Sequence, residues 1–322
     1  MWSFDLSGTS KRKVSESRQL GHRRRAGNSV LAVVALLCVA CFGLNARARG
    51  QVPPTPTANH SNPLPPGTPQ SWIAAAAQHQ LAILQDESLP LRYRTHKANQ
   101  KEDVTRVVIE SRQGNVARLV ERDGRPLTAA EDAAERSRLN DILRSPNDYL
   151  KHEKKDRVGL DYAVQLIKLM PRAMIYTYTP GQPQPEDAKS PQVVIDFRPN
   201  PAFKPPTMIS EVLTGLEGRL WIDARTGRMT RAQAHLLNTV NVAWGVIAKI
   251  YSGGTVELEQ TRVDGNRWVY THFEENLTMR EMMVRSVTDN TKMTAWDFKP
   301  LPTPLSFQDA VRELLAMPVK LQ

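Results

Sequence analysis

The chain has 322 residues, with 43 Lys and Arg against 33 Asp and Glu, so its formal net charge is +10. Residues 1–50 carry +7 of this charge and the remainder only +3. The basic excess therefore belongs to the N-terminal segment, and we expect no nucleic-acid partner. Both cysteines, Cys38 and Cys41, lie in the same segment, which excludes disulfides and cysteine metal sites from the rest of the chain.

The N-terminal segment has the order of features that is typical of a secretory signal peptide. Three arginines at 23–25 precede an apolar run of 15 residues from Val30 to Leu44, and Ala46-Arg47-Ala48 follows. The run suits a signal peptide, and it is shorter than the roughly 18–20 residues that span a bilayer. We therefore expect export, with cleavage at the site formed by Ala46 and Ala48. Two alternatives stay open: a retained anchor that holds the domain at the membrane facing the periplasm, or a lipoprotein acylated at Cys41.

A Pro-rich linker separates this segment from the folded part. Residues 51–70 contain seven prolines and almost no large apolar side chains. Such a composition favours an extended spacer that buries no core. We therefore predict a signal peptide or anchor at 1–50, a linker at 51–70 and one domain at 71–322. Roughly 250 residues are enough to bury a core without disulfides.

Four helices are predicted in this domain. The first begins at Ser71, carries apolar residues at 73, 77, 81 and 84 on one face, and ends before Pro90. The second spans 128–144 and opens with Thr128-Ala129-Ala130-Glu131, the spacing of a capping box. The third spans 148–170, between two prolines. The last is capped by Ser306.

The other segments read as strands joined by short turns. They lie at 93–99, 104–111, 116–121, 174–178, 192–198, 216–223, 229–238, 255–263, 267–277, 282–288 and 293–298. Consecutive hairpins form an antiparallel meander, and the middle helices must cover one of its faces. The predicted fold class is α+β, with a large curved antiparallel sheet and helices packed on its concave face or at one end. An N-terminal apolar signal or anchor helix precedes it.

One hairpin resembles a known family. The segment Leu216-Glu217-Gly218-Arg219-Leu220-Trp221-Ile222-Asp223-Ala224-Arg225-Thr226-Gly227-Arg228 is similar to the "G-x-L-W-I-D-x-x-T-G" hairpin of LolA-like outer-membrane lipoprotein-sorting proteins, which related periplasmic sigma-factor regulators also carry. The order of elements is similar too. The resemblance implies a half-open barrel around an apolar cavity closed by helices, with a lipid or a lipoprotein acyl chain as ligand.

Two segments are candidates for the wall of such a cavity. Leu220 and Ile222 share one face of their strand, opposite Arg219, Trp221 and Asp223. The apolar segment 242–251 has no polar face, and its Trp244, Val246 and Ile247 complete the predicted ligand-binding set. The alternative for each is purely structural: a well-formed hairpin in the first case, and a buried strand or bend in the second.

Catalytic motifs are absent from the sequence. It has no G-x-S-x-G, no phosphate-binding G-x-x-x-x-G-K-[ST], no G-x-G-x-x-G and no two histidines three or four residues apart. His96, His235 and His272 lie on predicted strands, as do the carboxylates at 257, 259, 274 and 275. Alternation predicts a solvent face for Glu257 and Glu259. We therefore expect a non-enzymatic protein without a cofactor or metal.

The expected function is binding of a lipid or lipoprotein acyl chain in the periplasm. The alternatives are an envelope sensor or scaffold that acts through an envelope protein partner, and an unrecognised hydrolase. A carrier would be purified with bound acyl chains. In a scaffold, the protein's own side chains would fill the cavity.

Overall fold

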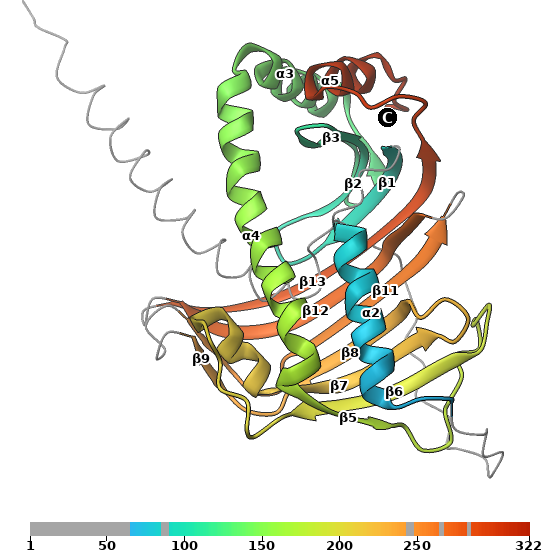
Figure 1. Cartoon of the computed structure of the whole chain (residues 1–322). Coiled ribbons are helices and arrows are strands. Elements are labelled where there is room, and N and C mark those ends of the chain that lie inside the picture. Colours follow the sequence, from blue (N-terminus) through green and yellow to red (C-terminus); the bar gives the residue numbers. More distant parts are fainter. Residues whose placement is uncertain (1–64, 85–89, 243–247, 264–266, 282–284) are drawn as a thin grey trace, which may run out of the picture.

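The computed structural model describes residues 65–84, 90–242, 248–263, 267–281 and 285–322. The predicted leader and most of the linker lie outside these residues, as do Trp244, Val246 and Ile247. The described part forms one large antiparallel sheet with four α-helices and one 3-10 helix (Figure 1). The fold is therefore α+β.

The helices and strands follow one another in this order: α2 (Pro69–Leu84), β1 (Leu91–Ala98), β2 (Asp103–Ser111), β3 (Gly114–Arg122), β4 (Arg125–Pro126), α3 (Ala129–Arg144), α4 (Pro146–Ala173), β5 (Met174–Tyr178), β6 (Gln192–Pro199), η1 (Met208–Thr214), β7 (Leu216–Asp223), β8 (Met229–Leu236), β9 (Val240–Val242), β10 (Ala248–Ile250), β11 (Thr255–Val263), β12 (Arg267–Glu281), β13 (Arg285–Pro300) and α5 (Phe307–Ala316).

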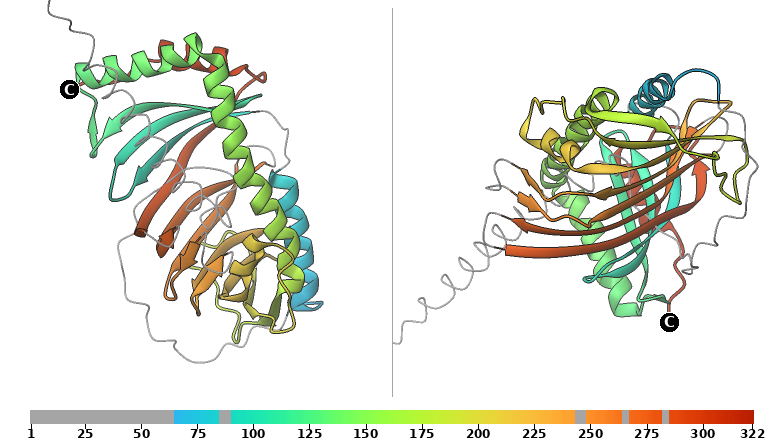
Figure 2. Two further views of the ribbon diagram at one scale, coloured as in Figure 1. Left: turned by 90° about the vertical axis from the view of Figure 1, so that its left-hand side faces the viewer. Right: turned by 90° about the horizontal axis from the view of Figure 1, so that it is seen from below.

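The sheet has 13 strands in the order β4-β3-β2-β1-β13-β12-β11-β8-β7-β6-β5, with β10 paired to β12 and β9 to β10. The predicted meander accounts for β5 to β8 and β11 to β13. The short β9 was not predicted, and β10 lies in the segment 242–251, for which a buried strand was the structural alternative. The first strand, β1, pairs with the last, β13, so the hairpins of β1–β3 extend the meander at its far edge. Figures 1 and 2 show that the sheet curves strongly, and its two edge strands, β4 and β5, do not meet.

The helices occupy two places on this sheet. α2 and the second half of α4 lie side by side across the concave face, and α3 and α5 gather at the end formed by β2 and β3 (Figure 2). Val107 and Ile109 belong to the apolar cluster with α5, whereas Val108 between them packs with Tyr93. Because side chains alternate along a strand, α5 lies on the opposite face from α2 and α4. Of the two predicted positions for the helices, the concave face holds for α2 and the second half of α4, and the end of the sheet holds for α3 and α5.

Local signals placed most helices correctly. In α3 the Thr128 hydroxyl accepts a hydrogen bond from the Glu131 amide (3.2 Å), and the Glu131 carboxylate accepts one from the Thr128 amide (2.8 Å). Ser306 likewise accepts from the Asp309 amide at the start of α5 (3.1 Å). α2 differs, because it begins at Pro69 inside the predicted linker. Proline suits a first helical turn, where its missing N–H leaves no bond unmade.

Pro171 does not end α4, which continues to Ala173. The last four carbonyl groups of a helix have no hydrogen-bond donor within it. In α4, residues from other parts of the chain donate a hydrogen bond to each of these four carbonyls. The Tyr176 hydroxyl donates to Met170 O (2.8 Å), and the Gln70 amide donates to Pro171 O. Asn200 donates to Arg172 O (3.2 Å) and to Ala173 O (2.9 Å). These contacts allow a proline in the last turn and attach the end of α4 to α2 and β6.

Two further predictions need correction. Residues 285–288 of the first predicted strand and all of the strand predicted at 293–298 belong to one strand, β13, because its long pairing with β12 continues through the polar residues between them; residues 282–284 lie outside the described residues. The 3-10 helix η1 at Met208–Thr214 was not predicted. Thr207 and Ser210 cap its first turn. Threonine and serine are also common in loops, so in the sequence these two residues did not mark the start of a helix.

The β7–β8 hairpin explains the residue types of its motif. Gly227 has φ of +67°, a conformation that residues with a side chain rarely adopt. A Cβ atom at Gly218 would lie 2.0 Å from the carbonyl oxygen of Gln233 on β8. Both glycines are therefore required by the close pairing of these strands.

Candidate functional site

Leu220 and Ile222 lie on the concave face, as the resemblance implied. In register, Leu220 pairs with Ile195 and Ala232, and Ile222 pairs with Val193. Both are buried, with 7% and 0% of their surface exposed. They belong to the main apolar cluster, which also contains side chains of α2 and α4: Ile73, Ala76, Leu166, Leu169 and Ala173. Helix side chains thus fill this part of the face.

The two covering helices differ in how deeply they are buried. α4 buries Ala163, Leu166, Ile167, Leu169 and Ala173, whereas the buried apolar residues of α2 are only Ile73 and Ala76. The third buried residue of α2 is polar. Gln80 donates to the Tyr270 hydroxyl, and its carbonyl accepts from Gln260 (3.2 Å). α2 is an alanine-rich helix attached to the sheet by few apolar contacts and a small polar network.

The opposite, convex face of β7 is charged. Trp221 lies between two arginines, with the Arg219 and Arg231 guanidinium carbons 5.9 and 5.4 Å from its ring centroid. Asp223 closes the hairpin, accepting from the Arg225 and Thr226 amides (2.8 and 2.9 Å) and from the Ser190 hydroxyl. Burial alone would raise the pKa of Asp223, but these hydrogen bonds outweigh it and hold the pKa below its usual value.

Three of the four candidate carboxylates lie together on the convex face, and only Glu275 does not. Glu257 lies opposite Glu274 in register, Glu257 and Glu259 lie beside Arg231, and Glu274 pairs with Lys292 (2.6 Å). The predicted polar face of β11 is confirmed. A hollow of about 750 Å³ lies over this part of the convex face and is lined by Asp196, Arg219, Glu217, His235, Glu257 and Glu274 among others.

Glu275 faces the other way, into the concave side. It is 4% exposed, and its Oε2 atom has no hydrogen-bond partner among the described residues. Burial raises the pKa of Glu275 to about 8, and the nearby Asp289 adds to the rise while Lys97 opposes it. The concave face is therefore not uniformly apolar. The parity of Glu275 with Phe273 and Leu277 on one strand is the signal that would have identified it.

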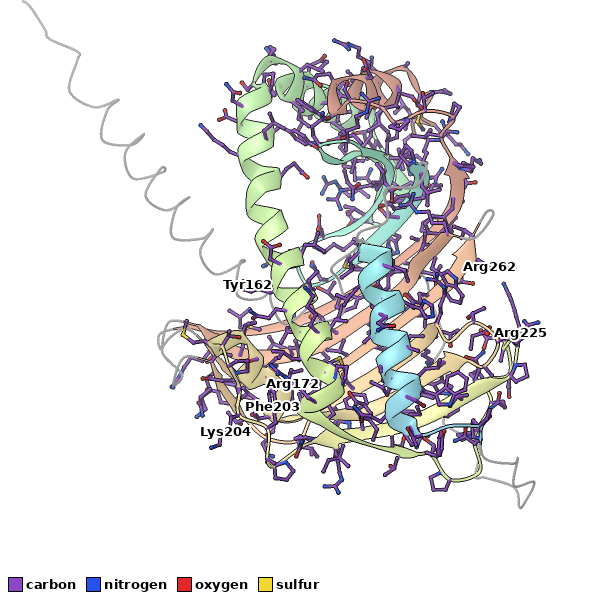
Figure 3. The ribbon with its side chains drawn as sticks, in the orientation of Figure 1. Tyr162, Arg172, Phe203, Lys204, Arg225 and Arg262 are labelled. Atoms are coloured by element: carbon purple, nitrogen blue, oxygen red, sulfur yellow. The ribbon has the colours of Figure 1, made fainter. Side chains whose placement is uncertain are left out.

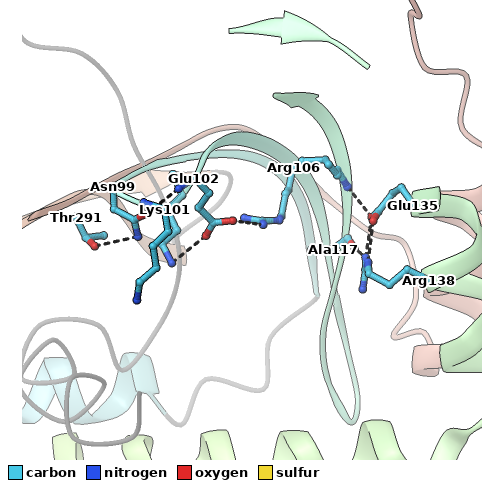
Figure 4. Close-up of polar contacts among 10 residues, drawn as sticks. Asn99, Lys101, Glu102, Arg106, Ala117, Glu135, Arg138 and Thr291 are labelled. Carbon is cyan, nitrogen blue, oxygen red and sulfur yellow. Dashed lines mark hydrogen bonds and ion pairs between the residues drawn. The ribbon is translucent and has the colours of Figure 1, made fainter. Parts of the chain in front are cut away.

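Polar contacts join the strand next to this carboxyl, β13, to the β1–β2 turn, and others join β3 to α3 (Figure 4). Thr291 lies opposite Glu275 in register, and the Asn99 amide donates to its hydroxyl (3.5 Å). Asn99 also accepts from the Lys101 and Glu102 amides, and Arg106 donates to Glu102 (2.8 Å). Beyond β3, Glu135 accepts from the Leu119 amide (2.8 Å) and pairs with Arg138 (2.7 Å). These bonds attach the β1–β2 turn to β13 and α3 to the edge of β3.

The strand histidines also stay apart. His96, His235 and His272 each lie beside a different carboxylate: Asp103 at 2.5 Å, Glu217 at 2.7 Å and Glu274 at 3.8 Å. Among the residues that the structure describes, no three His, Cys, Asp or Glu side chains gather to hold a metal ion. Within the same residues, no helix is long and apolar enough to cross a membrane.

Several predicted site residues fall outside the described part of the chain. Trp244, Val246 and Ile247 lie between β9 and β10, and Ala46 and Ala48 lie in the leader. The ligand-binding and cleavage roles given to them stay predictions. Of the predicted cavity wall, the structure describes Leu220 and Ile222 alone.

Comparison with known proteins identifies no family for this chain. No family model matches it, and no curated protein matches it. Among solved structures, the crystal structure of a DUF1329 family protein from Desulfovibrio piger aligns over 74% of this chain and 95% of that one. The two are 10% identical with a TM-score of 0.26, too low to establish a shared fold. The resemblance to LolA-like proteins is not confirmed.

Proposed function

We propose that this protein is exported to the cell envelope, where its sheet acts as a half-open barrel that holds the acyl chain of a lipid or lipoprotein. No reaction is catalysed. The acyl chain occupies the concave face beside Leu220 and Ile222, in the place that α2 takes in this structure. The observation that carries the proposal is the shallow burial of α2 on an otherwise apolar part of the sheet.

The energetics favour exchange of α2 for an acyl chain. Displacing α2 exposes the buried Ile73 and Ala76 and removes the partly buried Trp72 from the main apolar cluster. Each methylene group of an acyl chain that becomes buried contributes about 0.8 kcal/mol. A long chain therefore offsets the loss of α2 and part of the cost of its own ordering. α4, with five buried apolar residues, remains as the fixed wall.

A second candidate is an envelope sensor or scaffold. Two observations favour it: helix side chains already fill the concave face around Leu220, and the hollow on the convex face is lined mainly by charged and polar groups. Such a protein acts through a partner protein and holds no lipid.

Native mass spectrometry and probe uptake separate the two candidates. The full chain, purified from its native envelope in mild detergent, is expected to carry acyl species. Ile73→Ala, which loosens α2, should speed uptake of a fluorescent fatty acid several-fold. Leu139→Ala is the matched control, because Leu139 is equally buried in the separate cluster of α3 and α5. No bound lipid together with no uptake by any variant would reject the carrier, and a copurifying protein would then support the scaffold.

A further inference from the structure

The outer side of α4, away from the sheet, carries a patch of exposed side chains. Tyr162, Lys168 and Arg172 belong to the helix itself. Lys204 and Met208 come from the segment that follows β6 and leads into η1, and both are exposed as well. We call these five residues the α4 patch.

Hydrogen bonds hold the segment after β6 along the helix. The Asn200 amide donates to Arg172 O (3.2 Å), and the Thr207 hydroxyl donates to Gln165 Oε1 (2.9 Å). The segment therefore runs antiparallel to the last turns of α4 over about 10 Å, and Lys204 lies between its two attachment points. Figure 3 shows Lys204 and Arg172 on the same side of the molecule as Tyr162.

The cations of the α4 patch are not neutralised by neighbours. Within the part of the chain that the structure describes, no ion pair or hydrogen bond engages the side chains of Lys168, Arg172 and Lys204. Two carboxylates border the patch, Asp161 on α4 and Glu211 on η1. Glu211 already takes part in another interaction. The patch is therefore locally positive, and it is complementary to an anionic partner.

The other two members of the α4 patch give it an amphipathic character. Met208 is 49% exposed and Tyr162 is 36% exposed, among the most exposed large apolar side chains of the described residues. Tyrosine is enriched at the boundary between membrane and water, where its ring contacts the acyl region and its hydroxyl stays hydrated. Exposed apolar side chains beside lysine and arginine are typical of surfaces that lie against anionic bilayers.

The N-terminal part of the chain enters the domain next to this patch. The Gln70 amide of α2 donates to Pro171 O, one residue before Arg172, and the Tyr178 hydroxyl donates to Gly67 O (3.0 Å). Residues 45–64 separate the described chain from the predicted apolar segment at 30–44, and a chain of that length reaches at most about 70 Å. A retained anchor would therefore hold the α4 patch within reach of the bilayer.

We propose that the α4 patch docks on the surface of an anionic bilayer. Lys168, Arg172 and Lys204 contact lipid phosphates, and Tyr162 and Met208 enter the interface. A lipid surface fits better than a free anion, because the two apolar side chains have no role toward free phosphate. The proposal concerns how the folded domain meets a membrane, so it does not rest on acyl-chain binding at the concave face.

Lysine acetylation of the full chain, read by mass spectrometry, tests the contact at the patch itself. Vesicles of phosphatidylglycerol mixed with phosphatidylcholine should protect Lys168 and Lys204 several-fold. Vesicles of phosphatidylcholine alone, and inorganic phosphate, should not. Lys189, which is exposed beside Arg225 at the far rim of the sheet, is the internal control and should stay reactive. A local measurement is needed because residues 1–50 carry +7 and can attract such vesicles without the domain.

Two variants of the patch, each with a matched control, use the same measurement. Arg172→Gln should reduce the protection of the two lysines about fivefold, because each cation close to an anionic bilayer contributes about that factor in affinity. Arg225→Gln, which removes an exposed cation at the far rim, should not. Tyr162→Ser should also reduce the protection, whereas Leu150→Ser, at an exposed apolar residue of the same helix, should leave it unchanged.

Several results would overturn the proposal. They are no protection by phosphatidylglycerol vesicles, equal protection by inorganic phosphate, and equal protection of Lys189. Undiminished protection in both Arg172→Gln and Tyr162→Ser would overturn it too, because adsorption through residues 1–50 would then account for the shielding.

Discussion

At the scale of single residues, β12 shows how strand parity decides the chemistry of a carboxyl group. Glu274 and Glu275 are adjacent in the chain and face opposite sides of the sheet. Glu274 is partly exposed and paired with Lys292, whereas Glu275 is buried without a partner for one oxygen. Burying an ionised carboxylate is costly, so the neutral acid is favoured in the folded state.

Stability should therefore fall with rising pH because of Glu275. The ordinary pKa of this carboxyl is 4.5, and in the folded protein it is about 8. Between these values the folded state keeps a proton that the unfolded chain has lost, so the free energy of unfolding decreases as the pH rises. We expect a loss on the order of 3 kcal/mol between pH 5 and pH 8, measured by urea unfolding.

Glu275→Gln keeps the shape of the side chain and cannot ionise, so it should remove this part of the pH dependence. Glu274→Gln is the control and should retain it. If Glu275→Gln unfolds with the same pH slope as the original protein, the carboxyl of Glu275 titrates normally and the concave face is wetter than its burial indicates.

At the scale of elements, the helices at the β2–β3 end are held by one buried arginine. Arg118 of β3 is 1% exposed, donates to Leu314 O (2.6 Å) and Met317 O (2.9 Å) at the end of α5, and pairs with Asp132 of α3 (2.7 Å). A single side chain thus joins a strand, the start of one helix and the last carbonyls of another.

Asp132→Ala should lower the free energy of unfolding by about 3 kcal/mol, because it leaves a buried guanidinium without its counter-charge. Asp141→Ala removes a similar pair with Arg144 that is exposed on both sides, and we expect a loss below about 1 kcal/mol. Denaturant unfolding of both variants measures the difference. Equal losses would show that water reaches Arg118 and that the pair contributes no more than a surface pair.

At the scale of the whole molecule, the N-terminal segment and the folded domain differ in composition. Most of the net positive charge and both cysteines belong to residues 1–50, while the described domain is stabilised by its apolar clusters and hydrogen bonds. Its largest cluster spans the concave face from β5 to β13 with α2, α4 and η1.

Processing should release a domain without cysteines. N-terminal sequencing is expected to find Arg49, or a residue near it, as the first residue of the exported protein. This protein should then melt at the same temperature with and without a reductant. An intact N-terminus on membrane-bound protein would favour the retained anchor, and an acyl group on Cys41 the lipoprotein. Detection in the cytosol alone would contradict all three.

Local signals in the sequence were sufficient for most elements. The capping box at Thr128, the Ser306 cap and the alternation of β11 each depend on residues within a few positions of one another. The α+β class follows from these patterns. Alternation put Leu220 and Ile222 on one face of their strand, and only the resemblance implied that this face is the concave one. Proline was less reliable. Pro69 begins α2, where a first turn tolerates it, and Pro171 lies inside the last turn of α4, where partners from other elements satisfy the free carbonyls.

The tertiary structure alone decided the rest. The pairing of β1 with β13 joins segments nearly 200 residues apart, and no local pattern specifies it. The near-complete burial of Glu275 and the contacts of Arg118 with α3 and α5 depend on such packing of distant segments. The physical reason is that periodicity reports which face of an element is buried, whereas the partner that covers the face is chosen by long-range packing.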